Sequence, residues 1–181
     1  MEEEYLKHLA QVGAEDIEQL VRRYWKDVWH FAYVMTKQRD MADDIAQETF
    51  IRAFRSLHAF RGESTVKTWL LRIAKHLSIN HRRSAFFRHI VLLDQVRHRR
   101  SSPSAEADYF EGEFADRIWT LVLRLPAKQR EVLLLHAHYQ LKPEETANVL
   151  GLPQGTVKSR LHRARTQIDK WLKEADAIDS E

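Results

Sequence analysis

Apolar residues recur at intervals of three and four along almost the whole chain, which is the period of the α-helix. Only 5 Gly and 4 Pro interrupt the pattern. One apolar stripe runs through residues 17–35, a second begins near Asp40, and a third runs from Val66 to Leu77. We therefore expect an all-α protein whose first three helices form one domain.

The helical period weakens after about Ser84, and the segment beginning Ser101-Ser-Pro-Ser is followed by acidic residues. Regular apolar spacing resumes beyond it and continues to the end of the chain. We therefore expect two small helical domains, residues 1–85 and 113–181, joined by a flexible linker over residues 86–112.

A short helix, a tight turn and a basic helix are predicted in succession near the C-terminus. Pro143 suits the first position of a helix, and Gly151-Leu-Pro suits a turn. In the helix that follows, an apolar stripe faces inward and polar residues face outward or lie on the flanks. This division is typical of a helix-turn-helix that reads duplex DNA, although a solvated basic face on an ordinary bundle has the same composition. The inward set is Val157, Leu161, Ala164, Ile168 and Leu172, the outward set is Ser159, His162 and Arg163, and the flanking residues are Lys158 and Arg160.

The net charge of +3 conceals a very uneven distribution. Residues 1–51 carry 6 bases and 11 acids, whereas residues 52–100 carry 12 bases and 2 acids. A second cluster of four bases lies within residues 158–165, which contain no acid. Two separate basic zones favour two contacts with a polyanion such as DNA.

Composition excludes several other classes of function. The chain has no cysteine, so disulfides, thiolate metal sites and cysteine nucleophiles are excluded. The first residues are acidic and no apolar run approaches the roughly 20 residues of a membrane span, so we expect a soluble cytoplasmic protein without membrane insertion. The 10 histidines, including the pair His136 and His138, leave a metal-dependent enzyme as a remote alternative.

Four segments together resemble the extracytoplasmic-function (ECF) group of the sigma-70 family. Asp43-Asp-Ile-Ala-Gln-Glu-Thr-Phe is similar to region 2.2, and Phe60-Arg-Gly-Glu-Ser-Thr-Val-Lys-Thr-Trp is similar to regions 2.3 and 2.4. Leu125-Pro-Ala-Lys-Gln-Arg-Glu-Val-Leu and Gly155-Thr-Val-Lys-Ser-Arg-Leu-His-Arg-Ala-Arg are similar to region 4. The resemblance implies an alternative sigma factor that binds core RNA polymerase and directs promoter-specific initiation, with no enzymatic activity, metal or cofactor of its own.

The resemblance assigns the acidic second helix to polymerase binding. Its residues would face the clamp helices of the largest polymerase subunit. The acids at the start of this helix are also explained by a simpler role, because carboxylates there complement the helix dipole. The implied core-binding residues are Asp43, Asp44, Gln47, Glu48 and Phe50.

The resemblance also assigns the loop from Phe60 and the third helix to binding and melting of the -10 element. Trp69 corresponds to the first of two adjacent tryptophans in housekeeping factors, and Leu70 occupies the second position. Trp69 either stacks on a base or belongs to the core, since it lies on the inward stripe. The implied -10 residues are Phe60, Arg61, Ser64, Thr65, Lys67, Trp69, Lys75, Asn80, Arg82 and Arg83.

In region 4, the resemblance places -35 recognition on Lys158, Ser159, His162 and Arg163, with phosphate contacts from Thr156, Arg160 and Arg165. The implied partners are promoter DNA, the clamp helices and flap region of core polymerase, and an anti-sigma factor, with no small-molecule substrate. A LuxR-like transcriptional regulator that does not bind polymerase is the main rival. It leaves the segment from Asp43 and the Trp69 loop unexplained.

Overall fold

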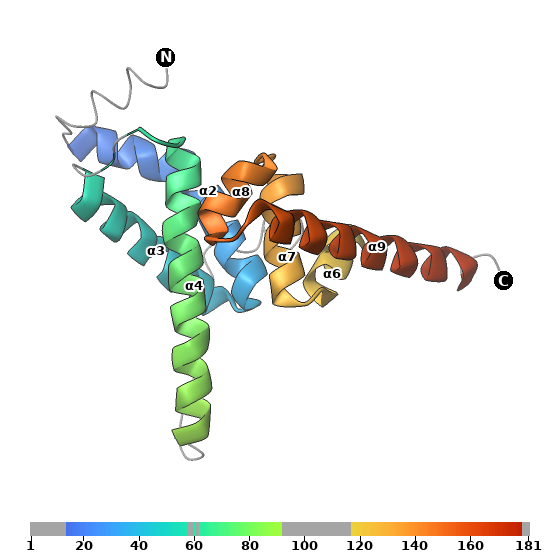
Figure 1. Cartoon of the computed structure of the whole chain (residues 1–181). Coiled ribbons are helices and arrows are strands. Elements are labelled where there is room, and N and C mark those ends of the chain that lie inside the picture. Colours follow the sequence, from blue (N-terminus) through green and yellow to red (C-terminus); the bar gives the residue numbers. More distant parts are fainter. Residues whose placement is uncertain (1–13, 58–59, 61, 92–116, 179–181) are drawn as a thin grey trace. The chain divides into compact units, whose positions relative to one another are not determined.

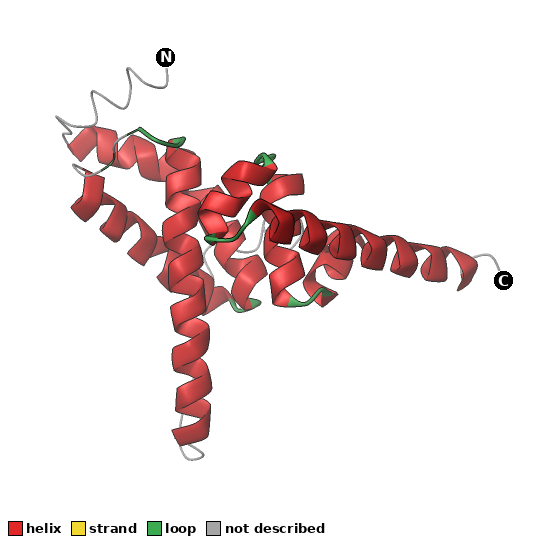
Figure 2. Cartoon of the chain, viewed as in Figure 1, coloured by secondary structure: helices red, strands yellow, loops and turns green. Residues whose placement is uncertain are grey.

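The computed structural model describes residues 14–57, 60, 62–91 and 117–178, and the side chains of 18–57, 60, 62–81 and 117–178 among them. Every regular element in these residues is a helix, which confirms the all-α prediction (Figure 2). The chain divides into two compact units, Met1–Ser102 and Pro103–Glu181.

The first unit contains three helices, α2 (Ala14–Thr36), α3 (Arg39–Ser56) and α4 (Val66–Val91), and each packs against the other two (Figure 1). The apolar stripes predicted from the sequence are largely buried. On α2, for example, Leu20, Val28 and Phe31 face inward. Helix α4 continues past residue 85, where the sequence places the end of the first domain. The predicted linker beyond Val91 lies outside the described residues.

The turn between α2 and α3 is set by the chemistry of three residues. Lys37 has a left-handed φ of 61°, and its N–H donates to the Tyr33 carbonyl at 2.7 Å, which ends α2. The Thr36 hydroxyl donates to the Ala32 carbonyl at 2.8 Å. The Lys37 bond satisfies one of the carbonyls that the end of a helix leaves without a partner, and α3 begins three residues after α2 ends.

The second unit contains α6 (Arg117–Arg124), α7 (Ala127–Leu133), a π-helical turn η2 (Leu134–His138), α8 (Pro143–Leu150) and α9 (Gln154–Ile178). The α7–η2 segment packs against α8 and α9. Its core includes Leu125, Val132, Leu135 and Val157. The sequence predicts one continuous helix through residues 132–139, whereas the last turn of that helix is a π-turn.

Helices α8 and α9 form the predicted helix-turn-helix. Pro143 is the first residue of α8, and the Glu145 carboxylate accepts the Lys142 N–H at 2.7 Å. Gly151 ends α8 with φ 66° and ψ 43°, a left-handed conformation that glycine adopts without steric cost. The Pro153 carbonyl then accepts the first N–H bonds of α9.

The C-terminal half of α9 is held against α6 by charged side chains. The Arg117 guanidinium donates to Asp176 at 3.0 Å, and the Arg124 guanidinium lies 4.6 Å from the centre of the Trp171 ring. Helix α9 therefore extends well beyond the helix-turn-helix, and its second half belongs to the packing of the second unit.

Candidate functional site

The outward face of α9 carries the residues that the sequence assigned to base contacts. Lys158, Ser159, His162 and Arg163 are all exposed, while the intervening stripe of Val157, Leu161 and Ala164 is buried. The predicted orientation of this helix is therefore confirmed. The Ser159 hydroxyl donates to the Thr156 carbonyl at 3.0 Å, so it can also accept a bond from outside the helix.

On the flank of α9, one of the residues expected to contact phosphate has a partner within the second unit. The Arg160 guanidinium donates to the Glu131 carboxylate of α7 at 3.1 Å, and these side chains are only 19% and 11% exposed. An arginine held in this way ties α9 to α7 and does not extend toward solvent. Thr156 is half-buried, and Arg165 is exposed on the flank of α9 that faces α6 and α7.

The loop before α4 and the start of that helix bring two aromatic rings together in the first unit. The centres of Phe60 and Trp69 lie 4.8 Å apart with the rings tilted by 43°, and both residues are half-buried. Trp69 is thus in contact with Phe60 and partly accessible, which leaves a stacking surface of reduced area. Thr65 caps α4, because its hydroxyl accepts the Thr68 N–H at 3.1 Å, and Ser64 is half-buried beside it.

The cations assigned to the -10 element differ in their surroundings. The Lys67 ammonium lies 2.8 Å from the Asp27 carboxylate of α2, so it is held by an internal ion pair. Lys75 is half-buried and Asn80 is exposed on α4. Arg61 and the side chains of Arg82 and Arg83 lie outside the described residues.

Helix α3 exposes only part of the set assigned to polymerase. Asp44 and Gln47 are exposed. Asp43 instead accepts the indole N–H of Trp29 at 2.6 Å, and Phe50 is only 3% exposed. The expectation that Phe50 faces a partner is therefore wrong for this conformation, because its side chain packs in the core between α3 and α2.

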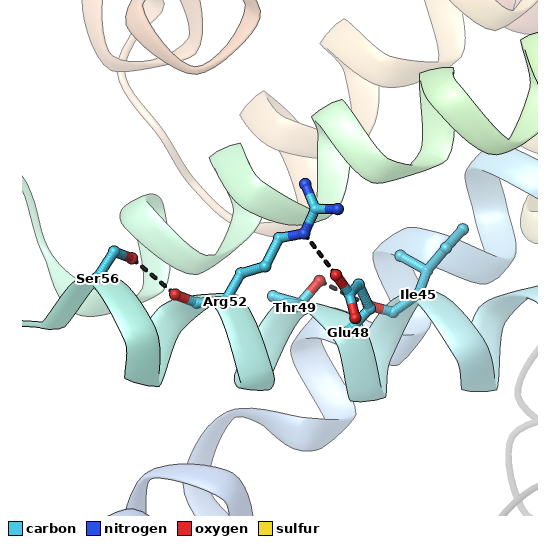
Figure 3. Close-up of polar contacts among 5 residues, drawn as sticks. All are labelled: Ile45, Glu48, Thr49, Arg52 and Ser56. Carbon is cyan, nitrogen blue, oxygen red and sulfur yellow. Dashed lines mark hydrogen bonds and ion pairs between the residues drawn. The ribbon is translucent and has the colours of Figure 1, made fainter.

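Other polar residues of α3 are bonded along the helix itself (Figure 3). The Arg52 guanidinium donates to Glu48 at 2.6 Å one turn earlier, and the Thr49 hydroxyl donates to the Ile45 carbonyl at 2.7 Å. Exposed pairs of this kind contribute only about 0.3–0.5 kcal/mol, so Glu48 can exchange Arg52 for an external base at little cost. The acid-bearing face of α3 is consequently available to a basic partner.

A groove in the second unit was not foreseen from the sequence. It measures about 400 Å³ and lies between α6, the α7–η2 segment and α9. Ile118, one of the apolar residues of α6, is 46% exposed and lines this groove. The regular apolar spacing of α6 does not distinguish a buried stripe from one that opens onto a groove. The lining includes apolar Trp119, Val122, Leu134 and Ile168, with His138, Arg165 and Asp169 among its polar residues.

The π-turn directs two histidines to different places. His136 forms a hydrogen bond through Nδ1 with the Leu141 carbonyl at 2.9 Å, and His138 is exposed with its ring edge-on to Trp119 at 5.3 Å. In the residues that the structure describes, no group of three potential ligands could hold a metal ion. These contacts give the metal-dependent alternative no support.

Within the described ranges, no helix combines the length and the apolar character that crossing a membrane requires.

Comparison with known families assigns both units. The model for Sigma-70 region 2 matches residues 20–86, and the model for Sigma-70, region 4 matches residues 115–168. The two matches occur in the order that the sequence motifs predicted. They cover the helices that carry the candidate sites.

Two curated sigma factors are similar to this chain over most of its length. The chain is 33% identical over 182 residues to the ECF RNA polymerase sigma factor SigC of Mycobacterium tuberculosis, which covers 94% of this chain and 89% of the relative. It is 30% identical over 158 residues to the RNA polymerase sigma factor YlaC of Bacillus subtilis, which covers 86% of this chain and 91% of the relative.

CnrH, solved in complex with the cytosolic domain of CnrY, has a similar fold, with a TM-score of 0.68, 24% identity and coverage of 96% of this chain and 97% of that one. The sigma factor RpoE, solved with the anti-sigma factor NepR from Bartonella quintana, gives a TM-score of 0.67, 23% identity and coverage of 88% and 98%. None of these comparisons supports a LuxR-like regulator. The family matches and the identities show that the chain belongs to the ECF group of the sigma-70 family of RNA polymerase sigma factors.

Proposed function

We propose that this chain docks on core RNA polymerase in the bacterial cytoplasm and directs the enzyme to a particular set of promoters. The carrying observation is the pairing of sigma-70 region 2 and region 4 in one chain. A helix-turn-helix alone is shared by many regulators, whereas a polymerase-binding region 2 has no use in them. The chain itself makes and breaks no bond; it positions polymerase and DNA.

Helix α9 is the proposed reader of the -35 element. Its exposed residues lie within its first three turns, which is the part of a recognition helix that enters the major groove. Arg163 can donate two bonds to a guanine, and Lys158 can neutralise a phosphate or donate to a base. Arg160 is removed from the DNA-contacting set because Glu131 holds it.

The first unit is the proposed binding site for the -10 element. The paired rings of Phe60 and Trp69 present a partly accessible aromatic surface, on which an unstacked base can pack. Lys75 and Asn80 of α4 follow this surface along one helix and can contact the adjacent phosphates and base edges.

Two surfaces are proposed to bind polymerase. The exposed Asp44 and Gln47 on α3 suit the clamp helices, because carboxylate and amide groups can pair with basic and polar side chains. The groove beside Ile118 in the second unit suits an amphipathic helix of the flap region, because an apolar floor with a few polar groups is the usual form of a helix-binding groove. An anti-sigma factor that covers either surface would keep the chain inactive.

Run-off transcription tests this function directly. Purified core polymerase is mixed with the chain and a pool of bacterial promoters, and new transcripts are sequenced. We expect transcripts from a defined subset of promoters. Asp44→Lys should abolish them all, because the reversed charge repels the basic partner, while Arg163→Ala should change which promoters are used. A folded chain that yields no added transcript would remove the sigma function.

A further inference from the structure

Lys67 lies at an electrostatically unfavourable position at the start of α4. It is the second residue of this helix, and the first turn contains no acid. The N-terminus of a helix carries a partial positive charge from its unpaired N–H groups, so a cation in the first turn is repelled. A negative charge from another part of the fold is needed to offset this repulsion.

Asp27 of α2 supplies that negative charge. Its carboxylate lies 2.8 Å from the Lys67 ammonium, and the two side chains are 25% and 38% exposed. Helix α2 packs against α4, and Val28, the residue after Asp27, is almost completely buried. The charge of Lys67 is therefore balanced by a residue that belongs to a different helix.

The ion pair between Asp27 and Lys67 is accessible enough to open. Partly exposed ion pairs contribute little to stability, because water solvates both charges and the long lysine side chain loses entropy when it is held. The core of the first unit, which includes Phe31 and Leu70, is buried whether or not the pair forms. A phosphate of a nucleic acid can thus replace Asp27 as the partner of Lys67 at a small cost in free energy.

The rings of Phe60 and Trp69 determine which strands can make this exchange. Trp69 belongs to the same helical turn as Lys67, and the two rings are the proposed packing surface for an unstacked base. A strand anchored on the rings keeps its phosphates near the lysine at a high effective concentration. A strand held by charge alone has no such anchor, and the Asp27 carboxylate repels its phosphates.

We propose that Asp27 determines selectivity for the -10 element: it occupies Lys67 until a strand anchored on the rings of Phe60 and Trp69 displaces it. Lys67 then adds a phosphate contact to promoter strands and none to other strands. Asp27 itself contacts no DNA and acts through Lys67. This inference rests on the proposed function, because it requires that the first unit binds the -10 element.

The salt dependence of strand binding tests this role in the complex of the full chain with core polymerase. The probes are a labelled non-template strand from a promoter that run-off transcription identifies, and a scrambled copy of that strand. Each phosphate contact with a single strand adds about 0.7 to the slope of log affinity against log salt concentration.

Asp27→Asn should steepen the slope for the scrambled strand by about 0.7, because the released Lys67 gains a phosphate. Over a roughly tenfold range of salt concentration this amounts to about a fivefold change in affinity. The slope for the promoter strand should stay the same, because Lys67 already contacts a phosphate in the wild-type complex. Asp27→Glu keeps the carboxylate and should restore the wild-type behaviour.

Glu18→Gln is the matched control. Glu18 is also an acid of α2 with a basic partner, since its carboxylate lies 2.6 Å from the Arg22 guanidinium on the same helix. The variant removes the same charge but releases no base of α4, so neither slope should change. Equal steepening in Asp27→Asn and Glu18→Gln would reflect net charge alone and would overturn the role of Asp27.

Lys67→Gln separates this role from a purely structural one. It should lower the slope for the promoter strand by about 0.7 and leave the slope for the scrambled strand unchanged. Asp27→Asn added to Lys67→Gln should then have no further effect on either slope, because Asp27 acts only through Lys67. An effect of Asp27→Asn that persists without Lys67 would overturn the proposal.

The wild-type complex distinguishes this failure from failure of the proposed function. If it prefers the promoter strand and Asp27→Asn leaves both slopes unchanged, only the further inference fails. If the chain directs no transcription by core polymerase, the proposed function fails and the further inference fails with it.

Discussion

Gly151 in the turn between α8 and α9 has a conformation that other residues adopt only with strain. Its φ is 66°, and no atom within 4 Å would obstruct a Cβ. Gly151→Ala should therefore lower the free energy of unfolding by about 1–2 kcal/mol through backbone strain alone. Gly155→Ala is the matched control: Gly155 lies in α9 with equally open surroundings, and alanine should stabilise it by about 0.5–1 kcal/mol. Chemical denaturation measures both, and shifts of the same sign would contradict the argument.

Two fully buried threonines differ in whether their hydroxyls are bonded. Thr49 donates to the Ile45 carbonyl at 2.7 Å, whereas the Thr146 hydroxyl has no hydrogen-bond partner among the described residues. Thr146→Val should stabilise the second unit by about 1 kcal/mol, because a methyl group of similar shape removes an unpaired buried hydroxyl. Thr49→Val should be neutral or destabilising. Thermal unfolding of the two variants decides the matter, and a loss of stability in Thr146→Val would indicate a bonded hydroxyl.

Helix α9 packs within the second unit and also carries the proposed DNA-contacting residues. Variants of Arg160 and Arg163 test these two roles separately. Arg160→Ala removes the ion pair that Arg160 makes with the largely buried Glu131 carboxylate, which should destabilise the second unit by about 1–3 kcal/mol. Below its melting temperature the variant should bind duplex DNA with an unchanged salt dependence. Arg163→Ala should show the opposite behaviour, with normal stability and about 1–3 kcal/mol less discrimination at one -35 position.

The salt dependence of binding is the decisive measurement for this pair. A phosphate contact contributes about 0.9 to the slope of log affinity against log salt concentration. If Arg160→Ala reduces that slope by about this amount without loss of stability, Arg160 contacts DNA and leaves Glu131 on binding.

At the scale of whole elements, the apolar period was sufficient to predict most helices. The stripes through Leu20 and Val28, and through Val157 and Leu161, are buried as the spacing requires. The turn at Gly151 was also predictable, because glycine near the end of a helical pattern marks a left-handed cap. The π-turn η2 was not, since it adds one residue per turn without a distinctive composition.

Individual contacts on the helix flanks could not be predicted from the sequence, because they depend on how the neighbouring helix packs. Spacing placed Arg160 on the flank of α9, but only the approach of α7 supplies Glu131 as its partner. Likewise the Phe50 ring stacks on Trp25, and that contact depends on a different helix. The sequence predicted a side chain's orientation well where it follows from the period of its own helix. It did not predict contacts that need a second helix.

At the scale of the molecule, the uneven charge corresponds to a division of labour between the units. The acidic zone at residues 1–51 includes all but the last five residues of α3, and the strongly basic zone at 52–100 includes α4. The proposed polymerase contact and the proposed nucleic-acid contact are thus separated within the first unit, which would limit repulsion between the acids and the DNA phosphates. The second basic zone lies on α9, and its last base, Arg165, lines the groove.

That groove is the proposed contact of the second unit with polymerase, and Ile118 is the residue through which this contact can be tested. Ile118→Asp places a carboxylate in the apolar lining near Asp169, and docking of a helix would then have to desolvate it. Because Ile118 is 46% exposed, the fold should tolerate the change. We expect transcription from promoters that depend on the -35 element to fall about tenfold, which corresponds to about 1.4 kcal/mol. The affinity of the free chain for duplex DNA should be unchanged.

Thr120→Asp is the control, because it introduces the same charge at an exposed position of α6 that does not line the groove. This variant should support normal transcription. Equal activity of the two variants would exclude the groove from docking and leave α3 as the proposed polymerase contact.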